Sequence, residues 1–218
     1  TLTTIGIETN KFNKIISDKV SKTKNINLEL FTIKFKLDPK ELSLFLETED
    51  PKINYKGLFI PVQNIKVYVD FLALLKSNLI TKKINITLKE INVSQLNKLS
   101  KIIKPSTFKS LIKNKIKEGK MTSEIEIFLD NQGELKNYIA KGEIKNRKAE
   151  LINNLKLTKT NFNFFADKED ILIKNIFGEI ENIKVLDGDM KLNFEKEIII
   201  NSNFYSKIFF DEKTVNKF

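Results

Sequence analysis

Apolar and polar residues alternate along most of the chain, the pattern typical of β-strands that bury one face and expose the other. The first long run covers residues 26–37 and changes phase at Phe31-Thr32, which predicts a β-bulge. Turn residues separate the later runs, among them Asp38-Pro39-Lys40, Asp130-Asn131-Gln132-Gly133, Asp167-Lys168-Glu169-Asp170 and Glu195-Lys196-Glu197. The pattern predicts about twelve antiparallel strands joined mainly as hairpins of a meander, with separate strands near residues 58–60 and 65–69.

Helical spacing of apolar residues occurs in only two places. Residues 71–76 predict one short helix. Residues 94–118 predict a helix-turn-helix insertion, which Pro105 interrupts and Gly119 closes. The expected organisation is an N-terminal groove-forming sheet at residues 1–93, a helical insertion at 94–119, and an antiparallel meander at 120–218 that continues the same sheet.

The width of the predicted sheet raises the question of what covers its apolar face. About twelve strands spaced about 4.8 Å apart form a sheet roughly 55 Å wide, whereas a helix is only about 10 Å across. Either the sheet closes as a sandwich or barrel, which would make a structural or adhesive domain without ligand, or part of its apolar face is left to hold a ligand. In the second case the groove is lined by Leu42, Leu44, Leu46, Ile65, Val67, Val69, Ile84, Ile86, Leu88, Ile125, Ile127, Leu129, Phe162, Phe164, Ile171, Ile173, Met190, Leu192 and Phe194.

The residue inventory excludes several kinds of chemistry. The chain has no Cys and no His, so thiolate sites, disulfides and histidine bases or ligands are excluded. Asp187-Gly188-Asp189 is interpreted as a hairpin turn, because calcium loops supply more oxygen ligands at fixed spacing. Carboxylates in solvent-facing turns have no cause for a raised pKa. We therefore expect no enzymatic activity, no cofactor and no bound metal.

A net charge of +10 makes phosphate-bearing partners worth considering. Arg147 is the only arginine, although base-edge and phosphate recognition favour the guanidinium group, and the lysines are spread along the chain. Phe162, Phe164 and Phe194 share the phase of neighbouring Ile and Leu residues, which favours a core or groove over base stacking. We therefore expect no nucleic-acid binding and interpret the charge as a solvated face that favours anionic membrane surfaces.

The N-terminal part of the chain has a distinctive order of segments: a strand, Pro-Lys-x-x-Tyr-x-Gly at residues 51–57, a strand, a short Leu-rich helix and a Lys-Ile-x-Ile strand. The segments are residues 5–12, 26–37, 42–46, 50–57, 60–61, 65–69, 71–76 and 84–91. This order resembles the AsmA-like family, the bacterial relatives of bridge-like lipid transfer proteins, over about residues 5 to 93 and more loosely after Met121.

The resemblance implies a tapered, folded-over antiparallel sheet, a β-taco, whose open apolar groove binds phospholipid acyl chains. It further implies movement of phospholipid towards the outer membrane or support of envelope integrity, with the membrane surface and other envelope proteins as partners. The implied location is the periplasm, with an inner-membrane anchor outside residues 1–218. The chain starts at Thr1 without a methionine, so we expect it to be part of a longer product.

Overall fold

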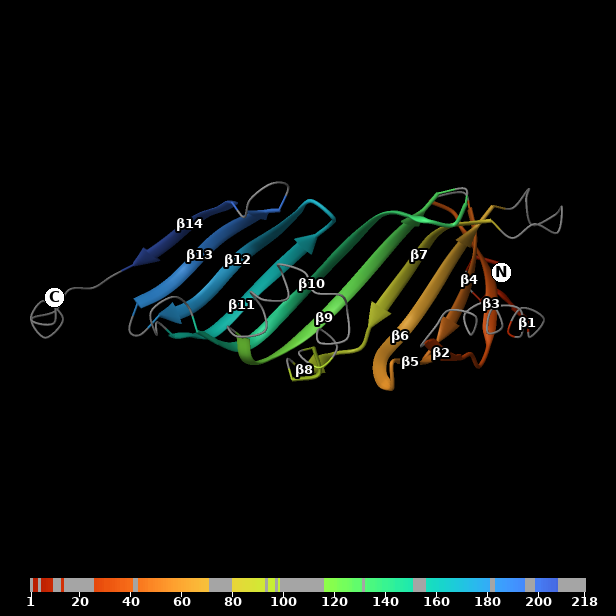
Figure 1. Ribbon diagram of the computed structural model, residues 1–218, viewed down its shortest axis with the longest axis horizontal. Helices are drawn as coiled ribbons and strands as arrows, with labels where there is room; N and C mark the ends of the chain where they lie inside the picture. Colours follow the sequence, from red (N-terminus) through yellow and green to blue (C-terminus); the bar gives the residue numbers. More distant parts are fainter. Residues whose placement is uncertain are drawn as a thin grey trace, which may run out of the picture. The chain divides into compact units, whose positions relative to one another are not determined.

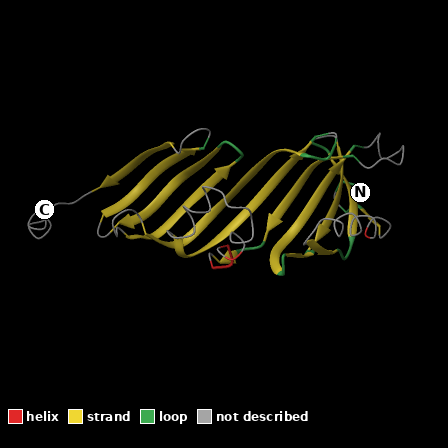
Figure 2. Ribbon diagram, viewed as in Figure 1, coloured by secondary structure: helices red, strands yellow, loops and turns green. Residues whose placement is uncertain are grey.

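The computed structural model describes residues 2–3, 5–9, 13, 26–40, 43–70, 80–92, 94–96, 98, 116–130, 132–150, 156–180, 183–194 and 199–207. Leu42, the predicted helix at residues 71–76 and the predicted turn at residues 195–197 lie outside these residues. Figure 2 shows that the described chain is almost entirely strand and turn, with helical residues confined to very short stretches. The predicted mainly β fold is confirmed.

In the described part of the chain, fourteen strands form one antiparallel sheet that is not closed. The main hydrogen-bonded path is β1-β3-β4-β6-β7-β9-β10-β11-β12-β13-β14, while β2 pairs with β5, β5 also pairs with β6, and β8 pairs with β9 (Figure 1). Because all the described strands belong to this one sheet, a closed two-sheet sandwich, the alternative fold, is not observed among them.

The chain divides into two compact units. Unit 1 comprises Thr1–Ile91, Lys101–Ile103 and Thr122–Lys141, and unit 2 comprises Asn92–Ser100, Lys104–Met121 and Gly142–Phe218. Unit 1 contains β1 (Ile7–Thr9), β2 (Ile26–Glu29), β3 (Ile33–Asp38), β4 (Ser43–Glu49), β5 (Lys52–Tyr55), β6 (Leu58–Val69) and β7 (Thr81–Leu88). Unit 2 contains β11 (Lys156–Ala166), β12 (Asp170–Ile180), β13 (Ile183–Asn193) and β14 (Ile199–Lys207). The short β8 (Ile91–Asn92), β9 (Ile116–Leu129) and β10 (Leu135–Glu150) each contribute residues to both units, so the units are not contiguous in sequence.

Tight turns set the register of unit 1. Lys56 and Gly57 form a two-residue loop in which both residues have positive φ, 50° and 78°, as a type I′ hairpin turn requires. The strand that follows, β6, pairs with β5 from Leu58 to Pro61 and with β4 from Asn64 to Val69. This one strand therefore replaces the two separate strands, near residues 58–60 and 65–69, that the alternation predicted.

The best-packed part of unit 1 lies on one side of β3, β4 and the end of β6. Ile33, Leu44, Leu46 and Val69 are buried together. Partly buried neighbours pack against this cluster: Leu2, Leu30, Phe35, Leu37 and Val67.

Unit 2 is a succession of antiparallel hairpins in which β11, β12 and β13 each pair with the next strand along the chain. The β11–β12 ladder shifts register near Asn161, and Asn175 on β12 has a φ of 54°. A residue in such a bulge loses its ladder partner. Asp189 on β13 supplies a replacement, because its Oδ1 accepts a hydrogen bond from the Asn175 N–H at 3.3 Å.

The predicted turn at Asp167 is confirmed, with the N–H groups of Glu169 and Asp170 donating to its carboxylate at 2.8 and 3.0 Å. The predicted turn at Asp187-Gly188-Asp189 is wrong, because all three residues lie inside β13. Glycine is needed there for packing. A Cβ at Gly188 would overlap the Phe204 ring, which crosses it from β14.

The structure corrects two other predictions, each at the boundary between two segments. Phe31-Thr32 is not a bulge within one strand but the break between β2, which pairs with β5, and β3, which pairs with β1 and β4. The helical insertion begins as expected, since Ser94, Gln95, Leu96 and Lys98 are helical. The predicted end of the insertion at residue 119 is wrong, because β9 already begins at Ile116. Residues 99–115 lie outside the described part of the chain.

Candidate lipid-binding faces

Cross-strand pairing places the predicted groove residues of unit 1 on one side of the sheet. One row runs across β3, β4, β6, β7 and β9 through directly opposed residues: Phe35, Leu46, Val67, Ile84 and Ile127. A second row crosses the same strands: Ile33, Thr48, Ile65, Ile86 and Ile125. Leu37, Leu44 and Val69 form a third row. These three rows are the apolar face of unit 1.

Leu88 and Leu129 share this side by strand alternation with Ile86 and Ile127. The apolar face of unit 1 thus contains every predicted residue of this unit that the structure describes. The predicted set omits its extension onto β3, where Ile33, Phe35 and Leu37 continue the rows. The alternation at residues 33–37 contains the signal for this extension, since it has the same period of two.

Burial changes along the rows of this face. Leu44, Leu46 and Val69 are 7%, 4% and 4% exposed. On β7 and β9, by contrast, Ile84, Ile86, Ile125 and Ile127 are only half-buried. The closed core of this face is therefore limited to the cluster around β4, whereas the rows on β7 and β9 retain accessible apolar surface.

The other side of the same strands is charged. A row opposite the apolar rows contains Lys34, Glu47, Lys66, Asn85 and Glu126 in cross-strand order. Glu47 is the most buried of these, and its carboxylate lies 2.5 Å from the Lys36 ammonium and accepts a 2.8 Å hydrogen bond from Asn64 Nδ2. This side, the charged face of unit 1, also carries the Phe45–Tyr68 ring pair, with Lys83 Nζ 4.1 Å from the Tyr68 ring centre.

Glu47 makes the stability of unit 1 depend on pH. Burial by itself would raise the pKa of Glu47, but hydrogen bonds from Lys36 and Asn64 and the charges of Lys36 and Lys66 lower it below its ordinary 4.5. A carboxylate with a lowered folded-state pKa stabilises the fold above its unfolded pKa, and this stability is lost as the pH falls through the folded value.

We therefore expect Glu47→Gln to lower the free energy of unfolding at neutral pH by about 1–3 kcal/mol and to flatten its fall below a pH of about 4.5. Urea unfolding at a series of pH values measures both effects. Glu49→Gln is the matched control, because the Glu49 side chain is 62% exposed and its Lys34 contact is 3.7 Å long. Equal pH profiles for wild type and Glu47→Gln would contradict the role assigned to this carboxylate.

Unit 2 repeats the amphipathic arrangement. One row contains Phe164, Ile173, Met190 and Ser202, and the next contains Ala166, Ile171, Leu192 and Ile200. With Phe162 and Phe204, which share the side of Phe164 and Ser202 by alternation, these residues form the apolar face of unit 2. Ile171 and Leu192 are buried, whereas Ile200 and Phe204 on β14 are 50% and 47% exposed.

The apolar face of unit 2 contains all but one of the residues predicted for this unit. The exception is Phe194, which follows the end of β13, where its N–H donates to the Glu169 carbonyl at 3.1 Å. The predicted set omits Ile200 and Phe204, whose alternation continues through Ser202. The opposite side of unit 2 is mainly polar and includes the 2.6 Å ion pair between Lys191 and Asp170. Apolar and aromatic residues on that side include Leu172, Phe165, Phe177, Ile199 and Tyr205.

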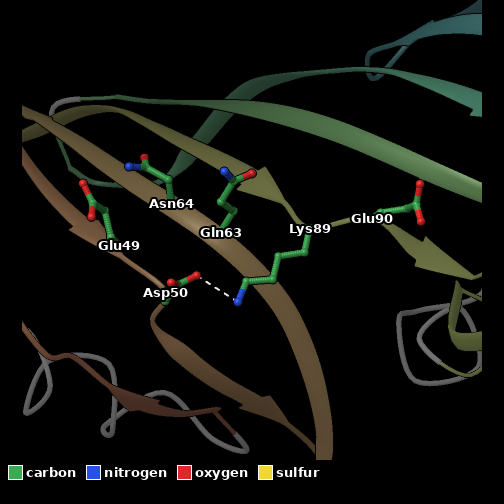
Figure 3. A pocket seen from close by; sticks show the side chains of 6 residues that line it. All are labelled: Glu49, Asp50, Gln63, Asn64, Lys89 and Glu90. Carbon is green, nitrogen blue, oxygen red and sulfur yellow. Dashed lines mark ion pairs between the residues drawn. The ribbon is translucent and has the colours of Figure 1, made fainter.

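A hollow on unit 1 is lined by polar and charged residues (Figure 3). Glu49, Asp50, Gln63, Asn64, Lys89 and Glu90 line it. Lys89 Nζ pairs with Asp50 Oδ1 across it at 2.8 Å. Because no apolar residue of the described part of the chain lines it, this hollow suits an acyl chain less well than the apolar faces do.

Within the described residues, no cluster of three or more acidic, His or Cys side chains is placed to hold a metal ion. The described helical segments also include none with the length and apolar character needed to cross a bilayer. No protein-family model, curated protein or solved structure matches the chain. The chemistry of the two apolar faces therefore carries the functional argument.

Proposed function

We propose that this chain is a non-enzymatic lipid-binding protein whose apolar sheet faces hold phospholipid acyl chains. The observation that carries the proposal is the division of each unit into a mainly apolar side and a mainly polar side on a sheet that is not closed. Such a division is expected where one side contacts water and the other contacts protein or lipid.

The half-buried rows on β7 and β9 suit the methylene groups of an acyl chain. Ile84, Ile86, Ile125 and Ile127 offer branched hydrocarbon side chains without a hydrogen-bonding group, on strands spaced about 4.8 Å apart. Each methylene group removed from water contributes roughly 0.8 kcal/mol. A few such contacts therefore give substantial affinity without a polar anchor.

The resemblance to AsmA-like proteins supports a cellular setting for this activity. In that setting the chain belongs to a periplasmic protein with an inner-membrane anchor outside residues 1–218. It moves phospholipid towards the outer membrane or supports envelope integrity, and it contacts membrane surfaces and other envelope proteins. The net charge of +10 agrees with contact to anionic headgroups.

Mild purification followed by solvent extraction and mass spectrometry tests the proposal directly. We expect phospholipid to copurify with the protein and delipidated protein to take up labelled phospholipid from phosphatidylethanolamine–phosphatidylglycerol vesicles. Absence of both copurified lipid and uptake by correctly folded protein would contradict the proposal.

A further inference from the structure

The strand β14 is the last strand of the described strand path. Within the described part of the chain only β13 pairs with it, and all nine of its residues are exposed. Natural sheets protect such edges with charges, prolines or bulges. The stretch from Ile199 to Ser206 has no charge and no proline, and the register shift between β13 and β14 skips a residue on β13 rather than on β14.

The sequence of β14 is symmetric in chemical character about Ser202. Asn201 and Asn203 flank this serine, Ile200 matches Phe204, and Ile199 matches Tyr205. Two such strands, aligned antiparallel with Ser202 opposite Ser202, place each Ile200 opposite a Phe204 and each Ile199 opposite a Tyr205. Pairs of β-branched and aromatic residues in direct opposition stabilise antiparallel ladders.

The same register preserves the two sides of the sheet. Ile200 and Phe204 both belong to the apolar face of unit 2, and Ile199 and Tyr205 both lie on the opposite side. An apolar side chain therefore meets an apolar side chain on each side, and no two charges are opposed between Ile199 and Tyr205.

We propose that β14 pairs antiparallel with β14 of a second copy of this chain, about a twofold axis at Ser202. Such an isologous contact closes on itself and gives a dimer. Pairing of β14 with the opposite end of the strand path in a second copy is less favourable, because β1 has only three residues against nine in β14. The dimer requires no lipid.

Sedimentation equilibrium over a concentration series tests the association. We expect wild type to dimerise reversibly. Ser202→Lys opposes two like charges at the axis and should weaken the dimer by about tenfold or more. Ser206→Lys is the matched control, with the same change on the same strand and side but outside the paired segment, and it should dimerise like wild type. Circular dichroism checks that both variants are folded.

Cysteine cross-linking tests the register, since the natural chain has no Cys. Ser202→Cys should give a disulfide-linked dimer under mild oxidation, because opposed Cβ atoms are about 4.5–5.5 Å apart. Ser206→Cys should stay unlinked, because two Ser206 positions would be roughly 27 Å apart in this register. A monomeric wild type, a Ser202→Lys dimer of unchanged affinity, or equal linking of both cysteine variants would each overturn the proposal.

Discussion

Ile127→Lys should leave unit 1 folded and weaken phospholipid uptake by about tenfold or more. Ile127 is half-buried at the β9 end of the row that starts at Phe35, and it lies directly opposite Ile84. A lysine there can extend its ammonium group to water along its hydrocarbon stem, so the fold tolerates it. An acyl chain on this row would instead contact a charge, which hydrocarbon cannot solvate.

Circular dichroism, urea unfolding and a vesicle-to-protein transfer assay together measure this outcome. Glu126→Gln is the matched control, because it also raises the net charge by one but changes the charged face of unit 1. It leaves Lys141 paired with Glu124 at 3.1 Å. A folded Ile127→Lys variant with wild-type uptake would show that lipid does not occupy this row.

Leu46→Lys, in the same row, should unfold unit 1. Leu46 is 4% exposed and belongs to the cluster with Ile33, Leu44 and Val69. A lysine at this position would bury its charge within the cluster, which costs more than about 4 kcal/mol. This cost is a large fraction of the stability of an ordinary domain.

The measurement is urea unfolding beside Ile127→Lys under the same conditions, with Leu46→Ala as a milder variant that should cost about 2–5 kcal/mol. The two variants introduce the same side chain in the same row, so the difference in their stability reports mainly the difference in burial. Equal stability of Leu46→Lys and Ile127→Lys would mean that the difference in burial between the two positions does not decide whether a charge is tolerated.

The sequence predicts which residues share a side of the sheet because strand alternation is a local property. Alternation alone assigns Leu46, Val67, Ile84 and Ile127 to one side, and the strand pairing agrees. A period of two cannot reveal which strands are neighbours. It also cannot reveal that Leu46 is buried while Ile127 is accessible, because that depends on packing from other strands.

The wrong predictions at Gly188 and at the end of the helical insertion have a similar origin. Turn chemistry favours a hairpin at Gly188, but the neighbour of this glycine is the ring of Phe204 from another strand. The residues before Gly119 follow a helical spacing, but strand pairing within the sheet makes Ile116 the first residue of β9. In both cases a distant part of the chain determines the structure, and no local pattern contains that information.

The order of pairing in unit 2 has a consequence for how the chain reaches its native state. Each described pairing from β11 to β14 joins strands that follow one another in sequence. Unit 1 instead pairs β2 with β5 and β7 with β9, which encloses longer stretches of chain. Because closing long loops slows folding, we expect unit 2 to acquire structure first, by adding one hairpin to the next, and unit 1 to be the slow kinetic phase.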